Sequence, residues 1–333
     1  MKTILVTGGA GYIGSHAVKL LLEKGFEVIV FDNLFRGYRD AIDALSTYGK
    51  LTFVQGDLRN FVEISGLFTD HTIDAVMHFA ALCLVNESME QPQLYFQNNI
   101  IGTYNLLEAM RSNKVNKLIF SSTCAVYGES QYLPVDEKHP LNPMNPYGES
   151  KLLSEKMIRW YGEIYGFSYA ILRYFNVCGA SSDGRIGDSK RPSQLLMQNA
   201  VRGAMGIEPF YLTCPEVETP DKTPVRDYID VEDLVAAHAA ALEYLRKSPG
   251  CEIFNLGNGA GFSVKQIVSK VSEICGVEIP MVKGETRKGE YASIYAQPEK
   301  ANITLNWKTE KSLEASIRSL QKWYEGHPQG FSH

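Results

Sequence analysis

A tyrosine and a lysine near the middle of the chain are spaced for proton transfer. Tyr147 and Lys151 are four residues apart at the start of a helical pattern over 146–165, so both side chains share one face of that predicted helix. A free tyrosine titrates at about pH 10, but a neighbouring ammonium group and a further positive charge stabilise the phenolate. The spacing therefore predicts a general base that works near neutral pH. The alternative is a surface tyrosine and lysine on an amphipathic helix.

A glycine-rich turn near the N-terminus predicts a site for a dinucleotide. It follows the apolar run 4–6, has glycines at 8, 11 and 14, and precedes a helical pattern over 15–24. Such glycines let the backbone turn tightly and approach a pyrophosphate at the helix N-terminus, where free N–H groups and the helix dipole favour anions. The alternative is a glycine cluster that only makes a turn.

Asp32 ends the next apolar run and lies 18 residues beyond Gly14. Its carboxylate is placed to accept a hydrogen bond from an adenosine ribose and to repel a 2′-phosphate, which favours NAD over NADP. Arg36 and Arg39 nearby leave NADP possible. An aspartate that only caps a turn is the other interpretation.

Composition narrows the class of protein. The chain has 333 residues, 44% of them hydrophobic, and a net charge of -5 without a basic block, so nucleic acid and anionic membranes are not expected partners. No apolar run approaches the roughly 20 residues of a membrane span. The first predicted strand begins at residue 2, which leaves no room for a signal peptide, so we expect a cytoplasmic protein. The six cysteines form no Cys-x-x-Cys pair and the seven histidines show no ligand spacing, so we expect reduced thiols and no metal.

Strand-like and helical patterns alternate along the first half of the chain. Apolar runs at 28–31, 51–54, 75–79, 118–121 and 169–172 are separated by helical stretches that include 92–112 and 146–165. This alternation predicts an α/β fold with a Rossmann-type, doubly wound parallel sheet. We expect residues 1–177 to form an NAD-binding domain, to which 225–258 returns. Residues 178–224 and 259–333 should form a smaller α/β substrate-binding domain, interleaved with the first in sequence.

Motifs along nearly the whole chain occur in an order that is typical of one superfamily. They are Tyr12-Ile13-Gly14-Ser15-His16, Asp32-Asn33-Leu34, His78-Phe79-Ala80-Ala81, Asn98-Asn99, Ser121-Ser122-Thr123, Val126-Tyr127-Gly128, Tyr147-x-x-x-Lys151, Leu172-Arg173-Tyr174-Phe175-Asn176, Val225-Arg226-Asp227-Tyr228-Ile229, Asn255-Leu256-Gly257-Asn258-Gly259 and Arg287-Lys288-Gly289-Glu290. Together they resemble the extended short-chain dehydrogenase/reductases and, within these, the UDP-glucose (UDP-galactose) 4-epimerase family.

The resemblance implies an NAD-dependent enzyme that interconverts UDP-glucose and UDP-galactose through a 4-keto intermediate. N-acetylated and pentose UDP-sugars are further candidate substrates. In this family's mechanism, Tyr147 removes the proton of the sugar 4-hydroxyl while C4 passes a hydride to NAD, Lys151 tunes that tyrosine and holds the nicotinamide ribose, and Thr123 hydrogen-bonds the 4-oxygen. The sugar then rotates and the same hydride returns, so the cofactor must stay bound.

The resemblance also implies sets of binding residues and a homodimer. Cofactor contacts are implied for Gly8, Gly11, Tyr12, Ile13, Gly14, Asp32, Asn33, Asp57, Leu58, Phe79, Ala80, Asn98, Ser121, Tyr147, Lys151 and Tyr174. Substrate contacts are implied for Thr123, Asn176, Gln194, Leu195, Arg226, Arg287 and Ile294. Among these, Arg226 and Arg287 would bind the diphosphate through planar guanidinium groups. The helices around 92–112 and 146–165 would pack into a four-helix bundle between two copies.

Several residues depart from the family pattern. Cys83 stands where some members have a lysine that reaches the cofactor, so that contact is not expected. The segment Leu212-Thr213-Cys214-Pro215 stands where an aromatic residue and a glycine near the uracil are common, which leaves the identity of the base open. Gln194 replaces a common asparagine. Ile294 stands where many members have an aromatic residue that limits the sugar's 2-substituent, so we expect a pocket that admits an N-acetyl sugar or a pentose.

Two other functions are alternatives to an epimerase. A nucleotide-sugar 4,6-dehydratase shares the fold and the Tyr/Lys pair, but its family follows the active-site threonine with Asp-Glu, whereas Thr123 is followed here by Cys124 and Ala125. A non-catalytic, NAD-sensing regulator would not need Thr123, Tyr147 and Lys151 together.

Overall fold

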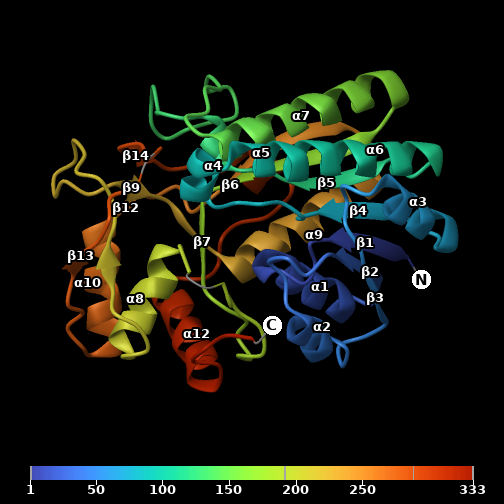
Figure 1. Cartoon of the computed structure of the whole chain (residues 1–333). Coiled ribbons are helices and arrows are strands. Elements are labelled where there is room, and N and C mark those ends of the chain that lie inside the picture. Colours follow the sequence, from blue (N-terminus) through green and yellow to red (C-terminus); the bar gives the residue numbers. More distant parts are fainter. Residues whose placement is uncertain (1, 191–192, 288, 332–333) are drawn as a thin grey trace.

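Seven parallel strands form the central sheet of the computed structural model, which describes residues 2–190, 193–287 and 289–331. Their order is β11-β6-β5-β4-β1-β2-β3 (Figure 1). The bounds are β1 Thr3–Thr7, β2 Glu27–Asp32, β3 Leu51–Gln55, β4 Ala75–His78, β5 Lys117–Ser121, β6 Ser168–Tyr174 and β11 Cys251–Leu256. The predicted doubly wound α/β fold is therefore confirmed.

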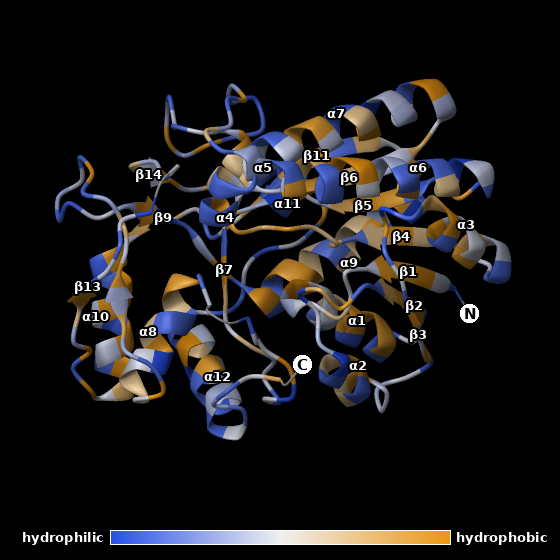
Figure 2. Cartoon of the chain, viewed as in Figure 1, coloured by the Kyte–Doolittle hydropathy of each residue, from blue (hydrophilic) through white to orange (hydrophobic). Residues whose placement is uncertain are grey.

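Helices cover both faces of this sheet, because successive apolar side chains of each strand point to opposite faces. Ile4 and Val6 pack with α1 (Tyr12–Glu23), α2 (Arg39–Leu45) and α9 (Val231–Lys247) on one face. Leu5 packs with α3 (Phe61–Asp70), α6 (Gly102–Ser112) and α7 (Pro146–Tyr165) on the other. The strands are accordingly apolar along most of their length (Figure 2).

A smaller group of helices and short strands lies beside the sheet (Figure 1). Helices α8 (Leu196–Ala204), α10 (Val264–Cys275) and α12 (Leu313–Gly326) share one apolar core around the fully buried Trp323. The short strands form three small sheets: β7 (Asn176–Cys178) with β10 (Tyr228–Asp230), β9 (Val225–Arg226) between β12 (Phe262–Ser263) and β14 (Ser293–Ile294), and β8 (Tyr211–Leu212) with β13 (Val282–Lys283).

Two details differ from the sequence-based expectations. Residues 225–230 form β9 and β10, which pair with the small sheets rather than with the main sheet, and only β11 from the returning segment joins the main sheet. The helix expected over 92–112 is divided into α5 (Pro92–Tyr95), a π-helix (Phe96–Ile101) and α6. The remaining elements are α4 (Val85–Glu90), a 3₁₀ turn (Cys124–Val126) and α11 (Glu299–Thr304).

The order of the sheet reverses on either side of β1, which pairs with β2 and β4. Such a switch point opens a crevice beyond the carboxyl ends of the strands. Gly8, directly after β1, has a φ of +74°, and a Cβ there would stand 2.5 Å from the Ala80 nitrogen after β4. Only glycine lets the two strand exits approach so closely.

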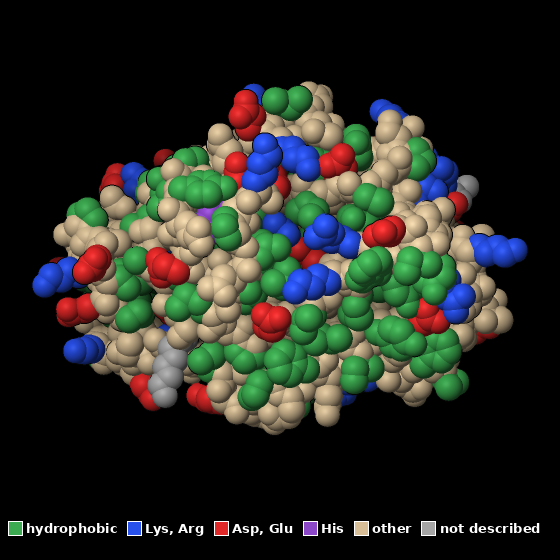
Figure 3. Space-filling view, turned by 90° about the horizontal axis from the view of Figure 1, so that it is seen from above, with side chains coloured by type: hydrophobic (Ala, Val, Ile, Leu, Met, Phe, Trp, Pro, Cys, Tyr) green, Lys and Arg blue, Asp and Glu red, His purple; other side chains and the backbone are tan. Residues whose placement is uncertain are grey.

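The distribution of charged side chains on the surface agrees with the absence of a basic block in the sequence. Acidic and basic side chains are interspersed over the face shown in Figure 3, without a field of one sign. Within the described ranges, no helix combines the length and the apolar character that crossing a membrane requires.

Candidate active site

The first turn of α1 forms an open cradle for an anionic group. A Cβ on Gly14 would stand 2.1 Å from the Gly8 oxygen, so packing within the turn requires glycine there. A Cβ on Gly11 would meet only that same oxygen, at 3.4 Å, so its missing side chain leaves room above the turn. Gly11 is the N-cap, no side chain of the described residues caps the helix, and its first turn has no acidic residue. The free N–H groups therefore fit the diphosphate of a dinucleotide.

Asp32, predicted to bind an adenosine ribose, ends β2 and contacts the glycine-rich turn through Ala10. Its carboxylate is buried and lines the main cavity of the protein, which contains most of the predicted site residues. It accepts hydrogen bonds from the backbone nitrogens of Ala10 (3.0 Å) and Leu34 (2.8 Å). Burial raises the pKa of this carboxyl, and the two backbone hydrogen bonds oppose the rise. The loop thus fixes both carboxylate oxygens beside the cavity.

Asn33 and Asp57 line the cavity and hold each other, because the Asn33 amide donates to the Asp57 carboxylate at 3.1 Å. Arg59 also donates to this carboxylate and lowers the pKa of Asp57 to about 2. Asp57 is therefore a fixed anion at neutral pH.

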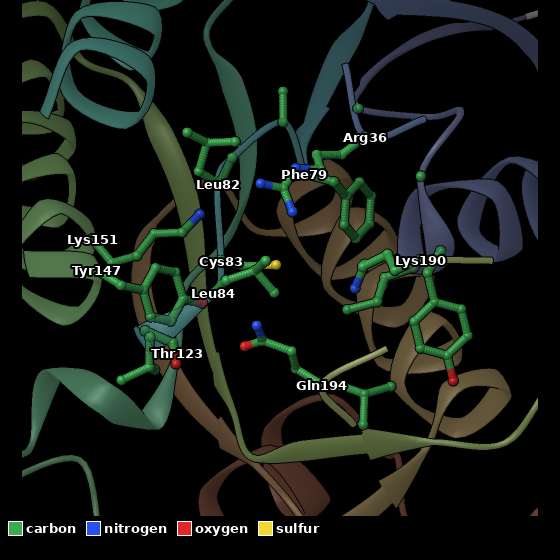
Figure 4. Close-up of a pocket in the computed structure, with 18 of the residues that line it drawn as sticks. Arg36, Phe79, Leu82, Cys83, Leu84, Thr123, Tyr147, Lys151, Lys190 and Gln194 are labelled. Carbon is green, nitrogen blue, oxygen red and sulfur yellow. The ribbon is translucent and has the colours of Figure 1, made fainter. Parts of the chain in front are cut away.

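Thr123, Tyr147 and Lys151 line the same cavity, on the side opposite Lys190 (Figure 4). Helix α7 positions the tyrosine in its first turn, where the Asn145 side chain caps the helix by accepting from the Gly148 nitrogen at 2.9 Å. One turn later, the Lys151 ammonium donates to the Ser121 carbonyl oxygen at 2.8 Å. The end of β5 and the start of α7 are thereby joined at the site.

Burial in the cavity changes the pKa values of Tyr147 and Lys151. Burial raises the pKa of Tyr147 well above its ordinary value, the neighbouring Tyr174 and Cys83 add to the rise, and hydrogen bonding with Thr123 opposes it. Burial lowers the pKa of Lys151 to about 8, against the effect of Cys83 and Glu155. In the protein alone burial thus favours the neutral phenol, and the role of Tyr147 as a base near neutral pH stays a prediction.

Two arginines line the cavity beyond Thr123. Arg226 is buried, donates to Glu290 at 2.8 Å, and lies over the ring of Tyr291 at 4.5 Å from its centroid. Arg287 donates to the backbone oxygen of Gln194 at 3.2 Å. Both arginines line the cavity, and Arg226 also donates to the backbone oxygens of Val225 and Tyr291.

Most residues predicted for the site line this one cavity, and two do not. The lining set is Gly8, Gly11, Tyr12, Ile13, Gly14, Asp32, Asn33, Asp57, Leu58, Phe79, Ala80, Asn98, Thr123, Tyr147, Lys151, Tyr174, Asn176, Gln194, Leu195, Arg226 and Arg287. Ser121 lies behind the wall, where its carbonyl holds Lys151. Ile294 is fully buried in β14 among Val126, Tyr127 and Ala296, because its strand directs it into the core.

Sequence reasoning missed several lining residues. Tyr291 lines the cavity, and its hydroxyl lies 3.8 Å from the Cys124 sulfur. Lys190 points into the cavity from the segment before α8. A second, smaller cavity shares Arg226 and Arg287 with the first, and Tyr211 is among its lining residues. No motif marks these positions, because distant segments bring them together.

The switch-point sheet, the glycine cradle and the convergence of Thr123, Tyr147 and Lys151 define a dinucleotide-binding enzyme of the extended short-chain dehydrogenase/reductase class. The chain belongs to the NAD dependent epimerase/dehydratase family, whose model matches residues 4–257.

Similar proteins extend this likeness over the whole chain. A UDP-glucose 4-epimerase of Halalkalibacterium halodurans is 45% identical over 331 residues, which cover 99% of this chain and 97% of that protein. A putative UDP-arabinose 4-epimerase of Arabidopsis thaliana is 41% identical over 340 residues, with 99% and 78% covered. The crystal structure of a Bifidobacterium longum UDP-glucose 4-epimerase in complex with NAD+ and UDP has a TM-score of 0.95 at 35% identity, with 99% and 100% covered.

Proposed function

We propose that the protein is an NAD-dependent UDP-sugar 4-epimerase that interconverts UDP-glucose and UDP-galactose. The observation that carries this proposal is a single cavity that contains the glycine cradle, the Thr123–Tyr147–Lys151 group and two arginines. Relatives named UDP-glucose 4-epimerase that match nearly the full length support the choice of reaction. The relatives named UDP-arabinose 4-epimerase keep a pentose as a second candidate sugar.

The proposed chemistry begins with a proton transfer at the sugar 4-hydroxyl. Tyr147 accepts this proton, and Thr123, whose hydroxyl is adjacent, hydrogen-bonds the 4-oxygen. Lys151 is held by Ser121 where it can contact a ribose hydroxyl of the cofactor. When bound, NAD supplies a reversible hydride acceptor and, in its oxidised form, a positive charge that favours the tyrosinate.

Inversion at C4 requires a firm hold on the nucleotide and a loose hold on the sugar. Arg226 and Arg287 lie where the main and the smaller cavity meet, which suits a diphosphate between base and sugar. We assign the smaller cavity to the base. Tyr211 lines it and is 53% exposed, so its ring is available for stacking, although the family's aromatic residue is expected within 212–215.

A dehydratase remains the alternative within this superfamily. Cys124 and Ala125 line the cavity next to Thr123, and neither can serve as the acid/base pair that eliminating water from C5 and C6 requires. An NAD-sensing regulator is a weaker alternative, because it gives no reason for the grouping of Thr123, Tyr147 and Lys151.

We further propose a division of the chain into an NAD-binding domain (1–177, with 225–258) and a substrate-binding domain (178–224 and 259–333). The cavity lies between residues of both parts. All six cysteines are free thiols, which suits the reducing conditions of the cytoplasm.

We also propose a homodimer formed through α6 and α7. Their exposed sides carry large apolar residues that water does not favour: Tyr104 on α6 is 48% exposed, and Trp160 and Ile164, one turn apart on α7, are 59% and 62% exposed. Sedimentation should show a dimer that a double Trp160→Glu, Ile164→Glu variant converts to monomer. A wild-type protein that stays monomeric at micromolar concentration would rule out this interface.

The decisive experiment is an NMR assay of the purified protein, without added cofactor, against UDP-glucose, UDP-N-acetylglucosamine and UDP-arabinose. We expect conversion of UDP-glucose to its C4 epimer by NAD that the protein retains. The relative rates then define the preferred sugar. If all three substrates return unchanged even with NAD added, the proposed reaction is wrong.

A further inference from the structure

Lys190 brings a positive charge into the cofactor cavity from the smaller part of the molecule. It precedes α8 and lines the cavity together with Gly11, Tyr12 and Ile13 of the glycine cradle. Figure 4 shows its side chain pointing into the cavity from the side opposite Tyr147 and Lys151.

The ammonium group lies close to the N-terminus of α1. It is 5.7 Å from the ring centroid of Tyr12, the first residue of that helix. The Tyr12 hydroxyl donates to the Gly179 oxygen at 2.5 Å, so the ring links the cradle to the segment that leads to Lys190. The Lys190 ammonium and the free N–H groups at the start of α1 therefore lie on neighbouring sides of the cavity.

The charge of Lys190 is only loosely neutralised by the protein. Its ion pair with Asp188 spans 3.8 Å, which is too long for a hydrogen bond, and the second oxygen of that carboxylate accepts from the Ser193 hydroxyl at 2.8 Å. Arg36, on the same rim, is paired tightly with Glu87 at 2.5 Å. A largely buried cation with so weak a partner is stabilised by an anion from outside the chain.

We propose that Lys190 binds the diphosphate of NAD from beside the glycine cradle and thereby helps to retain the cofactor. The cradle supplies backbone N–H groups and a helix dipole, and Lys190 supplies the full positive charge that the cradle lacks. Because the residue comes from the smaller part of the molecule, that part would hold cofactor as well as substrate. The inference rests on the NAD dependence of the family and not on the proposed sugar.

The test compares NAD retention in three variants: Lys190→Met, Lys190→Arg and, as a matched loss of one positive charge at the far end of α1, the exposed Lys24→Met. The amount of NAD that copurifies and its dissociation rate are measured, and UDP affinity is measured in parallel. We expect Lys190→Met to release NAD at least tenfold faster, a loss typical of a charge-assisted hydrogen bond. Lys190→Arg and Lys24→Met should behave like the wild type.

Two results would overturn the inference. One is wild-type NAD retention in the Lys190→Met protein. The other is a loss of UDP affinity with unchanged NAD release, which would assign the lysine to the substrate diphosphate. Thermal unfolding with saturating NAD checks that each variant folds, and Lys190→Gln replaces Lys190→Met if the latter does not. Because the readout is cofactor content, it is independent of whether the proposed epimerisation is correct.

Discussion

The phenol of Tyr147 is buried against Tyr174 and Cys83, with Thr123 as its hydrogen-bonding neighbour. Tyr147→Phe removes the only atom of this side chain that can take a proton and leaves the ring in place. We expect kcat for UDP-glucose to fall by roughly 10² to 10⁴-fold, with unchanged NAD content and thermal stability. Steady-state kinetics measure kcat, the absorbance of released NAD measures cofactor content, and thermal unfolding measures stability. Turnover by Tyr147→Phe close to the wild-type rate would contradict the assigned role.

The wall of the cavity between Thr123 and Arg226 is formed by Tyr291, through its contacts with Cys124 and the Arg226 guanidinium. Replacing its ring with the smaller side chain of valine should widen the sugar end. We expect Tyr291→Val to raise kcat/KM for UDP-N-acetylglucosamine relative to UDP-glucose by about tenfold, a change of about 1.4 kcal/mol in relative transition-state binding.

Ile294→Val is the control for that prediction, because Ile294 is fully buried and does not line the cavity. It should leave the ratio of the two substrates unchanged. An unchanged ratio in Tyr291→Val, or a ratio that responds to Ile294→Val instead, would show that Tyr291 does not limit the sugar.

Two pairs of residues show what the sequence could and could not predict at the site. Tyr147 and Lys151 are four apart on one helix, so local geometry alone brings them to one face. Tyr291 and Ile294 are three apart in a short strand region, where the side-chain direction depends on pairing with β9. A family position could be matched from sequence, but which side chain reaches the cavity is decided by that tertiary pairing.

Among the elements, α7 links the sheet to the chemistry, because its N-cap, Asn145, precedes Tyr147 by two residues. Asn145→Ala removes the acceptor for the Gly148 N–H and should cost about 1 kcal/mol of unfolding free energy. We also expect kcat to fall several-fold, since the first turn carries the tyrosine. Ser312→Ala removes the equivalent cap of α12 and should cost a similar free energy without changing kcat. Equal effects on kcat in both variants would argue against a positioning role for the cap.

A buried ion pair joins α7 to β6. Arg173 donates to Glu155 at 2.6 Å, both side chains are 2% exposed, and Glu155 also accepts from the Ser122 hydroxyl beside Thr123. Arg173→Met leaves a buried carboxylate uncompensated, and we expect it to destabilise the fold by about 3–5 kcal/mol. The double variant with Glu155→Leu should recover part of this loss. Denaturant unfolding measures both, and a double variant no more stable than the single one would contradict the explanation.

The main elements were predictable from sequence where burial gives a strong pattern. Strands that are buried on both faces appear as apolar runs, and α7 has both a cap and a period. The π-helix over Phe96–Ile101 and the two- and three-residue strands have no such pattern. Their hydrogen bonds depend on neighbours that are distant in sequence, so the sequence pattern does not reveal that residues 225–230 pair outside the main sheet.

For the molecule as a whole, buried titratable groups set how stability depends on pH. Burial lowers the pKa of His78 to about 3 and those of His16 and His238 to about 4. The unfolded chain binds these protons at about pH 6.5, so their contribution is present above that pH and is lost as the pH falls toward 4. Burial raises the pKa of Asp227 and Asp230 to about 6. Folding is favoured when these two are protonated, so they partly offset the loss.

The expected net result is a moderate fall in unfolding free energy between about pH 6.5 and 4. His238→Gln removes one histidine and should reduce the slope by up to about 1.4 kcal/mol per pH unit. Urea unfolding of both proteins at several pH values measures this difference. Parallel curves would show that His238 is protonated equally in the folded and unfolded states.

The position of β11 at the edge of the sheet affects how the chain folds while it is synthesised on the ribosome. Among the strands that the structure describes, this one pairs only with β6, and it follows β6 by about 80 residues, after the first segment of the smaller part. Until Cys251–Leu256 has emerged, one side of β6 is an unpaired edge that can associate with other nascent chains. Translation that stalls between these two strands should therefore yield aggregation-prone fragments, whereas release of the completed chain closes that edge.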